Sequence, residues 1–301
     1  MKAVQFAEYG GPEVLRVVDI EAPRPGPGEV RIAVRAAGVN PSDWKRRAGL
    51  YRAFDVVAFP SGVGVEASGI VDEIGPGVTN VSIGDAVFGM GRSTVAQQAI
   101  LTHWVRKPDD LSFEVAGGLS VIIETALRSL DDLGVRPGET LLVSGASGGI
   151  GSAVLQIARS RGIAVIGTAS VRNQAYLREL GAMPTPYGTG LKDRVRALAA
   201  HGVDAALDVA GSGIVPELID IVGEASRVVS VADFTASRHG ARFSAGPPRD
   251  PDRVLAEAAR LCGEGHFRLR IDRLFPLERT AEAHEVSARG HVAGKLVITV
   301  P

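Results

Sequence analysis

The sequence predicts an α/β protein in which a β-rich segment precedes a doubly wound parallel sheet. Up to about residue 121 the chain reads as short apolar runs separated by turn residues, a pattern typical of a barrel or a sandwich. Beyond that point, strand-like runs alternate with helical periodicity to about residue 247, and such alternation builds parallel sheets. A glycine-rich loop inside this second region indicates what the sheet binds.

An apolar strand, a glycine loop and a helix follow one another in LLVSGASGGIGSAVLQI at 141–157. The loop contains Gly145, Ser147, Gly148, Gly149, Ile150 and Gly151. Glycine lets the chain turn tightly and approach a ligand, and backbone N–H groups at a helix start attract a pyrophosphate. The glycine spacing departs from strict Gly-x-Gly-x-x-Gly, but the strand-helix-strand unit at 141–168 has the length of a mononucleotide-binding half. We therefore predict a dinucleotide site.

The end of the second strand of this unit, at 163–168, decides which dinucleotide fits. An NAD site usually places Asp or Glu there to bind the ribose 2′-hydroxyl, and this chain has neither at 168–173. Ser170 and Asn173 can instead donate hydrogen bonds to a 2′-phosphate, and Arg172 can add charge-assisted ones. We predict NADPH as the cofactor. The alternative for Arg172 is a solvated residue at the start of a helix.

The remaining elements follow from the same patterns. Half-buried strands are predicted at 30–37, 69–74 and 86–89, and a helix at 113–133. Further strands are expected to end near 187 and to span 203–209, 227–231 and 241–244, with helices at 191–200, 214–222 and 252–262, and with strand character in the tail at 267–300. The predicted domains are a catalytic, β-rich domain at 1–121 and 248–301, and a dinucleotide-binding domain at 122–247.

The composition is that of an ordinary globular protein. Of 301 residues, 45% are hydrophobic and 22% charged, and the net charge of -1 gives no indication of nucleic acid or of an anionic membrane as a partner. The first residues lack a signal-peptide core, so a cytoplasmic location is expected. The single cysteine, Cys262, excludes an internal disulfide and a Cys-rich zinc site, and the six histidines are scattered. We predict no metal site.

Several segments, in this order and spacing, resemble the zinc-independent quinone oxidoreductase branch of the medium-chain dehydrogenase/reductase superfamily. They are MKAVQFAEYGGPEVL at 1–15, GVNPSDWKRRAGLY at 38–51, GVEASGIVDEIGPGV at 64–78, GDAVFG at 84–89, the glycine loop, and GKLVITV at 294–300. The resemblance implies a chaperonin-10-like β-domain, a six-stranded Rossmann domain, a cleft between them and a homodimer. Short-chain dehydrogenases share a Gly-Ile-Gly loop, but no tyrosine of this chain has a lysine four residues later.

The departures from the zinc-dependent relatives are specific. Those relatives carry Gly-His-Glu where this chain has Gly64-Val65-Glu66, and they have a catalytic cysteine and four structural-zinc cysteines that are absent here. The resemblance therefore assigns no metal role to Glu66.

Reduction of a quinone or an enone without a metal requires hydrogen-bond donors for the oxygen on which charge develops, and a source of a proton. The resemblance brings Asn40, Lys45 and Tyr51 to this role. Asn40 would orient the nicotinamide ribose or the substrate, Lys45 would donate to cofactor or enolate, and Tyr51 would donate a proton or gate the pocket. Each has an alternative: Asn40 and Asp43 also fit a helix cap, Lys45 a solvated charge, and Tyr51 a buried wall residue.

The resemblance and the strand ends supply the other expected cofactor contacts. Thr125 would lie near the nicotinamide, with a hydroxyl bonded to its own helix backbone as the alternative. Tyr187 resembles the family tyrosine beside the cofactor phosphates. Because ligands bind at the carboxyl ends of parallel strands, backbone groups of Val209, Ala210, Val231 and Ala232 are expected along the nicotinamide half.

Three hypotheses for the function remain. The first is an NADPH-dependent reductase of quinones or α,β-unsaturated carbonyls, and Phe54 and Phe234 suggest that the acceptor is apolar. The second is a reductase that acts on one bulky enone of a biosynthetic pathway. The third is a nucleotide-binding regulator with little turnover.

Overall fold

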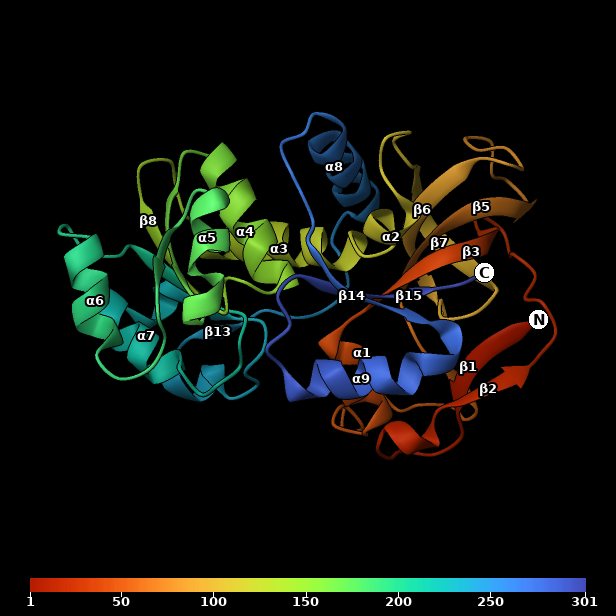
Figure 1. Cartoon of the computed structure of the whole chain (residues 1–301), viewed down its shortest axis with the longest axis horizontal. Coiled ribbons are helices and arrows are strands. Elements are labelled where there is room, and N and C mark those ends of the chain that lie inside the picture. The colour runs from red at the N-terminus through yellow and green to blue at the C-terminus, as the bar shows by residue number, and fades with distance from the viewer. The chain divides into compact units, whose positions relative to one another are not determined.

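The computed structural model describes all 301 residues, which fold as two units (Figure 1). The first unit contains Met1–Val121 and Asp250–Pro301, and the second contains Ile122–Arg249. No helix of the chain is both long enough and apolar enough to cross a membrane.

The first unit is built on a six-stranded sheet in the order β14-β15-β3-β5-β6-β7. Its strands are β3 (Val30–Val39), β5 (Glu66–Ile74), β6 (Ala86–Arg92), β7 (Gln98–Arg106), β14 (Ile271–Pro276) and β15 (Lys295–Thr299). Val30–Ala33 of β3 also pairs with β7, so the sheet closes on itself into a small barrel. A second sheet, in the order β2-β1-β4, is made of β1 (Lys2–Phe6), β2 (Arg16–Asp19) and β4 (Ser61–Gly62).

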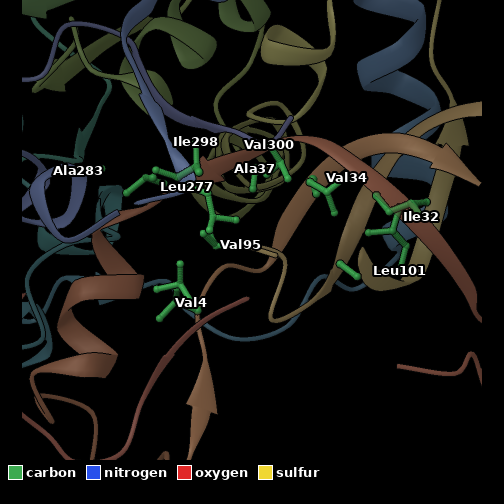
Figure 2. Close-up of a cluster of buried hydrophobic side chains, with 14 of the residues drawn as sticks. Val4, Ile32, Val34, Ala37, Val95, Leu101, Leu277, Ala283, Ile298 and Val300 are labelled. Atoms are coloured by element: carbon green, nitrogen blue, oxygen red, sulfur yellow. The ribbon is translucent and has the colours of Figure 1, made fainter. Parts of the chain in front are cut away.

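Apolar side chains that alternate along β3 fill the core of this unit. Val30, Ile32 and Val34 are buried, as expected for a strand with one face on a core. Figure 2 shows Ile32 and Val34 in one cluster with Ile298 of β15. The last strand of the chain therefore completes a core begun by the early strands, and it pairs antiparallel with β3.

Short helices accompany the sheets of the first unit. They are the 3-10 turns η1 (Pro12–Val14) and η5 (Leu277–Arg279) and the α-helices α1 (Pro41–Arg47), α2 (Phe113–Ala116), α8 (Pro251–Gly263) and α9 (Thr280–Arg289). α1 packs against α9, and α8 packs against β7.

The second unit contains six parallel strands in the order β10-β9-β8-β11-β12-β13. The strands are β8 (Thr140–Ser144), β9 (Ala164–Thr168), β10 (Met183–Thr185), β11 (Ala205–Asp208), β12 (Val228–Ser230) and β13 (Arg242–Phe243). Counted from β8, this is the order 3-2-1-4-5-6 of a doubly wound Rossmann sheet, whose ligand crevice opens at the strand ends where the order reverses. The predicted α/β fold, a chaperonin-10-like β-domain with a six-stranded Rossmann sheet, is confirmed.

The helices of the second unit connect these strands. They are α3 (Ser120–Leu133), α4 (Gly149–Ser160), α5 (Gln174–Glu179), α6 (Leu191–Leu198) and α7 (Val215–Val222), with 3-10 turns η2 (Val171–Asn173), η3 (Ala225–Arg227) and η4 (Ala236–His239).

Two predicted elements differ from the structure. The helix predicted at 113–133 is divided into α2 and α3 at Gly117 and Gly118. A Cβ on Gly117 would lie 2.6 Å from the backbone oxygen of Ala36, so the break is where the chain approaches β3. The tail at 267–300, predicted to have strand character, contains α9 between β14 and β15. Small residues such as Ala283, which is fully buried, give α9 a weak apolar pattern that the flanking strands obscure.

Candidate functional site

The glycine loop joins β8 to α4 at the carboxyl edge of the parallel sheet. Gly145 has φ +79°, a conformation that favours glycine, and Gly148 is the N-cap of α4. A Cβ on Gly151 would lie 2.5 Å from the carbonyl oxygen of Gly145, so the helix and the loop touch through backbone alone. The first N–H groups of a helix have no acceptor within it. The loop, with Ser147 and Ile150, therefore presents a cradle of backbone donors that suits a pyrophosphate.

The residues after β9 form a second polar group beside this cradle. Thr168 Oγ1 accepts a hydrogen bond from the Gly145 N–H (3.2 Å), and Asn173 Nδ2 donates to Ser147 Oγ (3.3 Å). Asn173 is 8% exposed, so the side chain that holds the glycine loop is buried in the protein. The hydroxyl oxygen of Ser170 is buried and has no protein partner, and Arg172 is exposed on η2. The unpartnered Ser170 hydroxyl and the exposed Arg172 guanidinium thus belong to the same short segment after β9.

A buried carboxylate, which the sequence analysis did not single out, organises the loops after β11 and β12. Asp208 Oδ1 accepts hydrogen bonds from the N–H groups of Ala210 (3.0 Å) and Gly211 (3.1 Å), and Asp208 Oδ2 accepts one from Ser230 Oγ (2.8 Å). Ser230 Oγ in turn accepts from the Ala232 N–H at 3.1 Å. The two loops, which carry Val209, Ala210, Val231 and Ala232, are thus fixed to one side chain. The signal in the sequence was a lone Asp at the end of an apolar strand.

The loop after β10 is likewise held by one side chain that binds its backbone. Tyr187 is 54% exposed. The Arg194 guanidinium on α6 donates to the carbonyl oxygens of Pro186 (3.0 Å), Gly188 (2.9 Å) and Thr189 (2.7 Å). Arg194 therefore positions the segment that carries Tyr187, and the sequence analysis missed it because its partners are backbone atoms.

Thr125 is buried within α3. Its hydroxyl donates to Glu124 Oε2 (3.2 Å) rather than to the helix backbone, and Glu124 pairs with Arg128 at 2.7 Å. The backbone alternative weighed for Thr125 is therefore not what the structure has.

In the first unit, Asn40, which follows β3, belongs to a buried network with side chains from β5 and β15. Asn40 Oδ1 accepts from Lys295 Nζ (2.6 Å), Asn40 Nδ2 donates to Glu66 Oε1 (2.8 Å), and Lys295 Nζ donates to the same Glu66 oxygen (2.7 Å). Asn40 is 4% exposed and Glu66 is 0% exposed. The sequence analysis gave no role to Lys295, because a lysine in a β-prone run is normally solvated.

The other polar residues of this segment have distinct surroundings. Asn40 is the N-cap of α1, as its helix-cap alternative expected, and Asp43 Oδ2 accepts from the Asn40 N–H (2.7 Å) in a capping box. Burial raises the pKa of Asp43 to about 7. Lys45 Nζ lies 5.8 Å from the centroid of the Trp44 ring. The Tyr51 ring packs against Phe54 with centroids 5.3 Å apart. Burial, followed by the charge of Asp43, raises the pKa of Tyr51, so its hydroxyl keeps its proton at neutral pH.

The side chains at the metal position of zinc-dependent relatives are differently engaged here. Val65 is 40% exposed, Glu66 is bound to Lys295, and no three or more His, Cys, Asp or Glu side chains lie close enough together to hold a metal ion. Burial raises the pKa of Cys262 to about 12, so this thiol stays protonated.

Residues 26–119 match the alcohol dehydrogenase GroES-like domain family, and residues 180–298 match the zinc-binding dehydrogenase family. A quinone oxidoreductase of Pseudomonas aeruginosa is 31% identical over 99% of both chains. A component of the pikromycin polyketide synthase of Streptomyces venezuelae is 32% identical over 93% of this chain, which spans 8% of that protein's length.

Solved structures agree with these matches. The quinone oxidoreductase from Coxiella burnetii has a TM-score of 0.88 and 33% identity, covering 100% of this chain and 99% of that one. A mycobacterial protein complexed with NADPH has a TM-score of 0.85 and 27% identity, covering 99% and 100% of the two chains. The chain therefore belongs to the medium-chain dehydrogenase/reductase superfamily, in the branch of the quinone oxidoreductases.

Proposed function

We propose that this chain is an NADPH-dependent reductase that transfers hydride to a quinone or to an α,β-unsaturated carbonyl without a metal. The observation that carries the proposal is the pairing of a glycine cradle with a carboxylate-free strand end. The cradle suits a pyrophosphate, while the buried Ser170 hydroxyl and the exposed Arg172 follow β9 where an NAD site would have an acid. The similarity to a mycobacterial protein complexed with NADPH supports the same cofactor.

The residues that would hold the cofactor divide by task. Ser147, Gly148, Gly149 and Ile150 would donate to the pyrophosphate from the loop, and Tyr187 would lie beside it. Ser170 and Arg172 would bind the 2′-phosphate, and Asn173 would support them through Ser147. Thr125, Val209, Ala210, Val231 and Ala232 would line the nicotinamide half. The bound nicotinamide supplies the hydride, so the protein's share is orientation and electrostatics.

The polar residues of the first unit would serve the acceptor. When hydride reaches the acceptor, negative charge develops on its oxygen, and positioned donors stabilise that charge. Asn40 would orient the nicotinamide ribose or the substrate, Lys45 would donate to the cofactor or the developing enolate, and Tyr51, whose hydroxyl is kept protonated by burial, would deliver the proton. The exposed Phe54 beside Tyr51 favours an apolar acceptor.

The similarity to a polyketide synthase component favours a second candidate. In this reading the chain reduces one bulky enone of a biosynthetic pathway, and small quinones are poor acceptors. The third hypothesis, a nucleotide-binding regulator with little turnover, predicts tight NADPH binding with no oxidation by any acceptor.

The test is NADPH oxidation by the purified chain with a small quinone, a linear enone, a bulky enone thioester and no acceptor. Turnover with the first two supports the proposal, and turnover with the thioester alone supports the second candidate. Binding without turnover towards any acceptor would reject both. Elemental analysis should find less than one zinc per chain, and chelation should leave the rate unchanged. Sedimentation should show the homodimer that the family implies.

A further inference from the structure

The network around Asn40 contains two charged residues to which the proposed function gives no task. Glu66 is 0% exposed and Lys295 is 4% exposed, and their charged atoms lie 2.7 Å apart. Burying an ion pair costs desolvation that the attraction between the charges often only matches. The pair is therefore better explained by what it holds in place than by stability.

We propose that Glu66 and Lys295 are positioning residues that fix the direction in which the Asn40 amide faces. The proposal rests on the proposed function, in which Asn40 contacts the nicotinamide ribose or the substrate. Lys295 Nζ donates to Asn40 Oδ1, and Asn40 Nδ2 donates to Glu66 Oε1. An ammonium has only donors and a carboxylate only acceptors. An inverted amide would place its NH₂ against the ammonium and its oxygen against the carboxylate, so one orientation is allowed.

The backbone around the pair keeps it from moving. Glu66 Oε2 accepts from the Val121 N–H (2.8 Å) in the first turn of α3. A Cβ on Gly38 would lie 2.5 Å from Glu66 Oε1, and a Cβ on Gly118 would lie 2.8 Å from Lys295 Cγ. The two glycines leave the space that the charged side chains fill.

The fixed amide has a defined chemical consequence. Asn40 Nδ2 has two N–H groups, of which one donates to Glu66. The other N–H is the group that a ligand can use. Glu66 and Lys295 act through Asn40: they determine on which side of the Asn40 amide a ligand meets the N–H donor and on which side the oxygen lies.

The test is the double variant Glu66→Gln with Lys295→Met. Each single change leaves a buried charge without its partner and should lower the unfolding midpoint. The double variant removes both charges. Its Gln oxygen must accept from the Val121 N–H, so its NH₂ faces Asn40, and the Asn40 amide has to invert to accept it. We expect the double variant to unfold at a higher temperature than either single variant. Its Asn40 amide should nevertheless face the opposite way from that of the parent.

We expect the single-turnover rate of NADPH oxidation in the double variant to fall by roughly tenfold to a hundredfold, as in Asn40→Ala, because misplacement of a positioned group has about this cost. The control is Arg31→Met with Asp72→Asn, which removes a 2.8 Å ion pair of the same unit and should leave the rate unchanged. A folded Glu66→Gln/Lys295→Met variant with the parent rate would overturn the proposal.

Failure of the proposed function would look different. If Asn40→Ala keeps the parent rate and the parent affinity for NADPH, then Asn40 has no contact to position and both assignments are rejected. If the parent oxidises NADPH with none of the acceptors tested, the proposed activity fails. Fluorescence titration of NADPH then decides whether Glu66 and Lys295 position Asn40. In that case, weaker binding in Asn40→Ala and in the double variant supports the positioning role, and parent-like binding in the double variant rejects it.

Discussion

The glycine loop of the second unit and the Asn40 network of the first unit create polar sites in opposite ways. The loop takes its donors from the backbone of a few consecutive residues, and it works because Gly145 and Gly151 have no side chains. The network takes its donors and acceptors from side chains separated by 26 to 255 residues. Added volume should therefore damage the loop, while a changed charge or hydrogen-bonding group should damage the network.

The largest effect is expected for Gly151→Ala. The added Cβ would lie 2.5 Å from Gly145 O and 2.6 Å from Ala146 Cα, and these are backbone atoms that cannot turn aside. Overpacking of this kind typically costs about 1–3 kcal/mol. Displacement of the cradle should also weaken NADPH binding. We expect a loss of roughly a hundredfold, the size of effect that a misplacement of about 1 Å has on a positioned group. Thermal unfolding and fluorescence titration measure the two losses.

Gly263→Ala is the matched control for this variant. Gly263 ends α8, and a Cβ there meets nothing within 4 Å. The change should be neutral or stabilising by up to about 1 kcal/mol, since alanine is the better helix former. Equal losses in the two variants would show that volume at the loop is not the cause.

The same contrast explains which parts of the molecule the sequence predicts. The loop, β8 and α4 can be predicted from residues adjacent in the sequence, and the glycines are explained by the turn that these same residues make. Lys295 stands in a β-prone run 255 residues from Asn40, and only the pairing of β15 with β3 brings it near. No local pattern marks a lysine that the fold will bury.

Asp208 and Arg194 were missed for a related reason. Both act on backbone atoms of loops, Asp208 as an acceptor and Arg194 as a donor, and any loop sequence supplies such atoms. α9 was missed because only one of its buried residues, Ala283, is apolar, the others being Thr280 and His284, and because its neighbours are strands. The alternation of strands and helices in the second unit and the glycine loop, which depend on local patterns, were predicted.

Tyr51→Phe tests whether the first unit supplies a proton as well as a network. The change removes the hydroxyl and preserves the ring that packs on Phe54. If the hydroxyl donates to the product or to the developing oxyanion, the single-turnover rate with a saturating enone should fall about 10²-fold, with NADPH affinity intact. A rate within a few-fold of the parent would make Tyr51 a wall residue and leave Lys45 or water as the proton source.

Arg172→Ala tests the charged side chain of the second unit that the proposed function assigns to the cofactor. A charge-assisted hydrogen bond contributes about 1.5–3 kcal/mol, so NADPH should bind roughly tenfold to a hundredfold more weakly. NADH, which lacks the 2′-phosphate, should be unaffected. Arg178→Ala, an exposed arginine on the following helix, is the control and should change neither affinity. Equal losses for both cofactors in Arg172→Ala would contradict the NADPH assignment.

The last prediction concerns pH, for which the parent should show the smallest effect. It separates the two regions because titratable groups are buried around α1 and α9 and not in the loop. Burial, ahead of the charge of Arg47, lowers the pKa of His284 from 6.5 to about 3. His284 is therefore neutral when folded and takes up a proton on unfolding, so its contribution to stability is lost as pH falls below 6.5. Burial raises the pKa of Asp43 from 3.8 to about 7, against the hydrogen bond from the Asn40 N–H and the charge of Lys295. Its contribution is present below 3.8 and is lost as pH rises towards 7.

Between about pH 4 and 6.5 the two contributions oppose each other, each with a slope of up to about 1.4 kcal/mol per pH unit. The pair therefore adds little net pH dependence to the unfolding free energy of the parent. Asp43→Asn, which keeps an oxygen for the Asn40 N–H, should reveal His284, so that stability falls with acid. His284→Gln should reveal Asp43, so that stability rises with acid. Denaturant unfolding at pH 4.5, 5.5 and 6.5 measures the slopes. If both variants keep the parent's slope, then Asp43 and His284 titrate alike in the folded and unfolded chains, and the charges buried near Asn40 do not distinguish it from the loop.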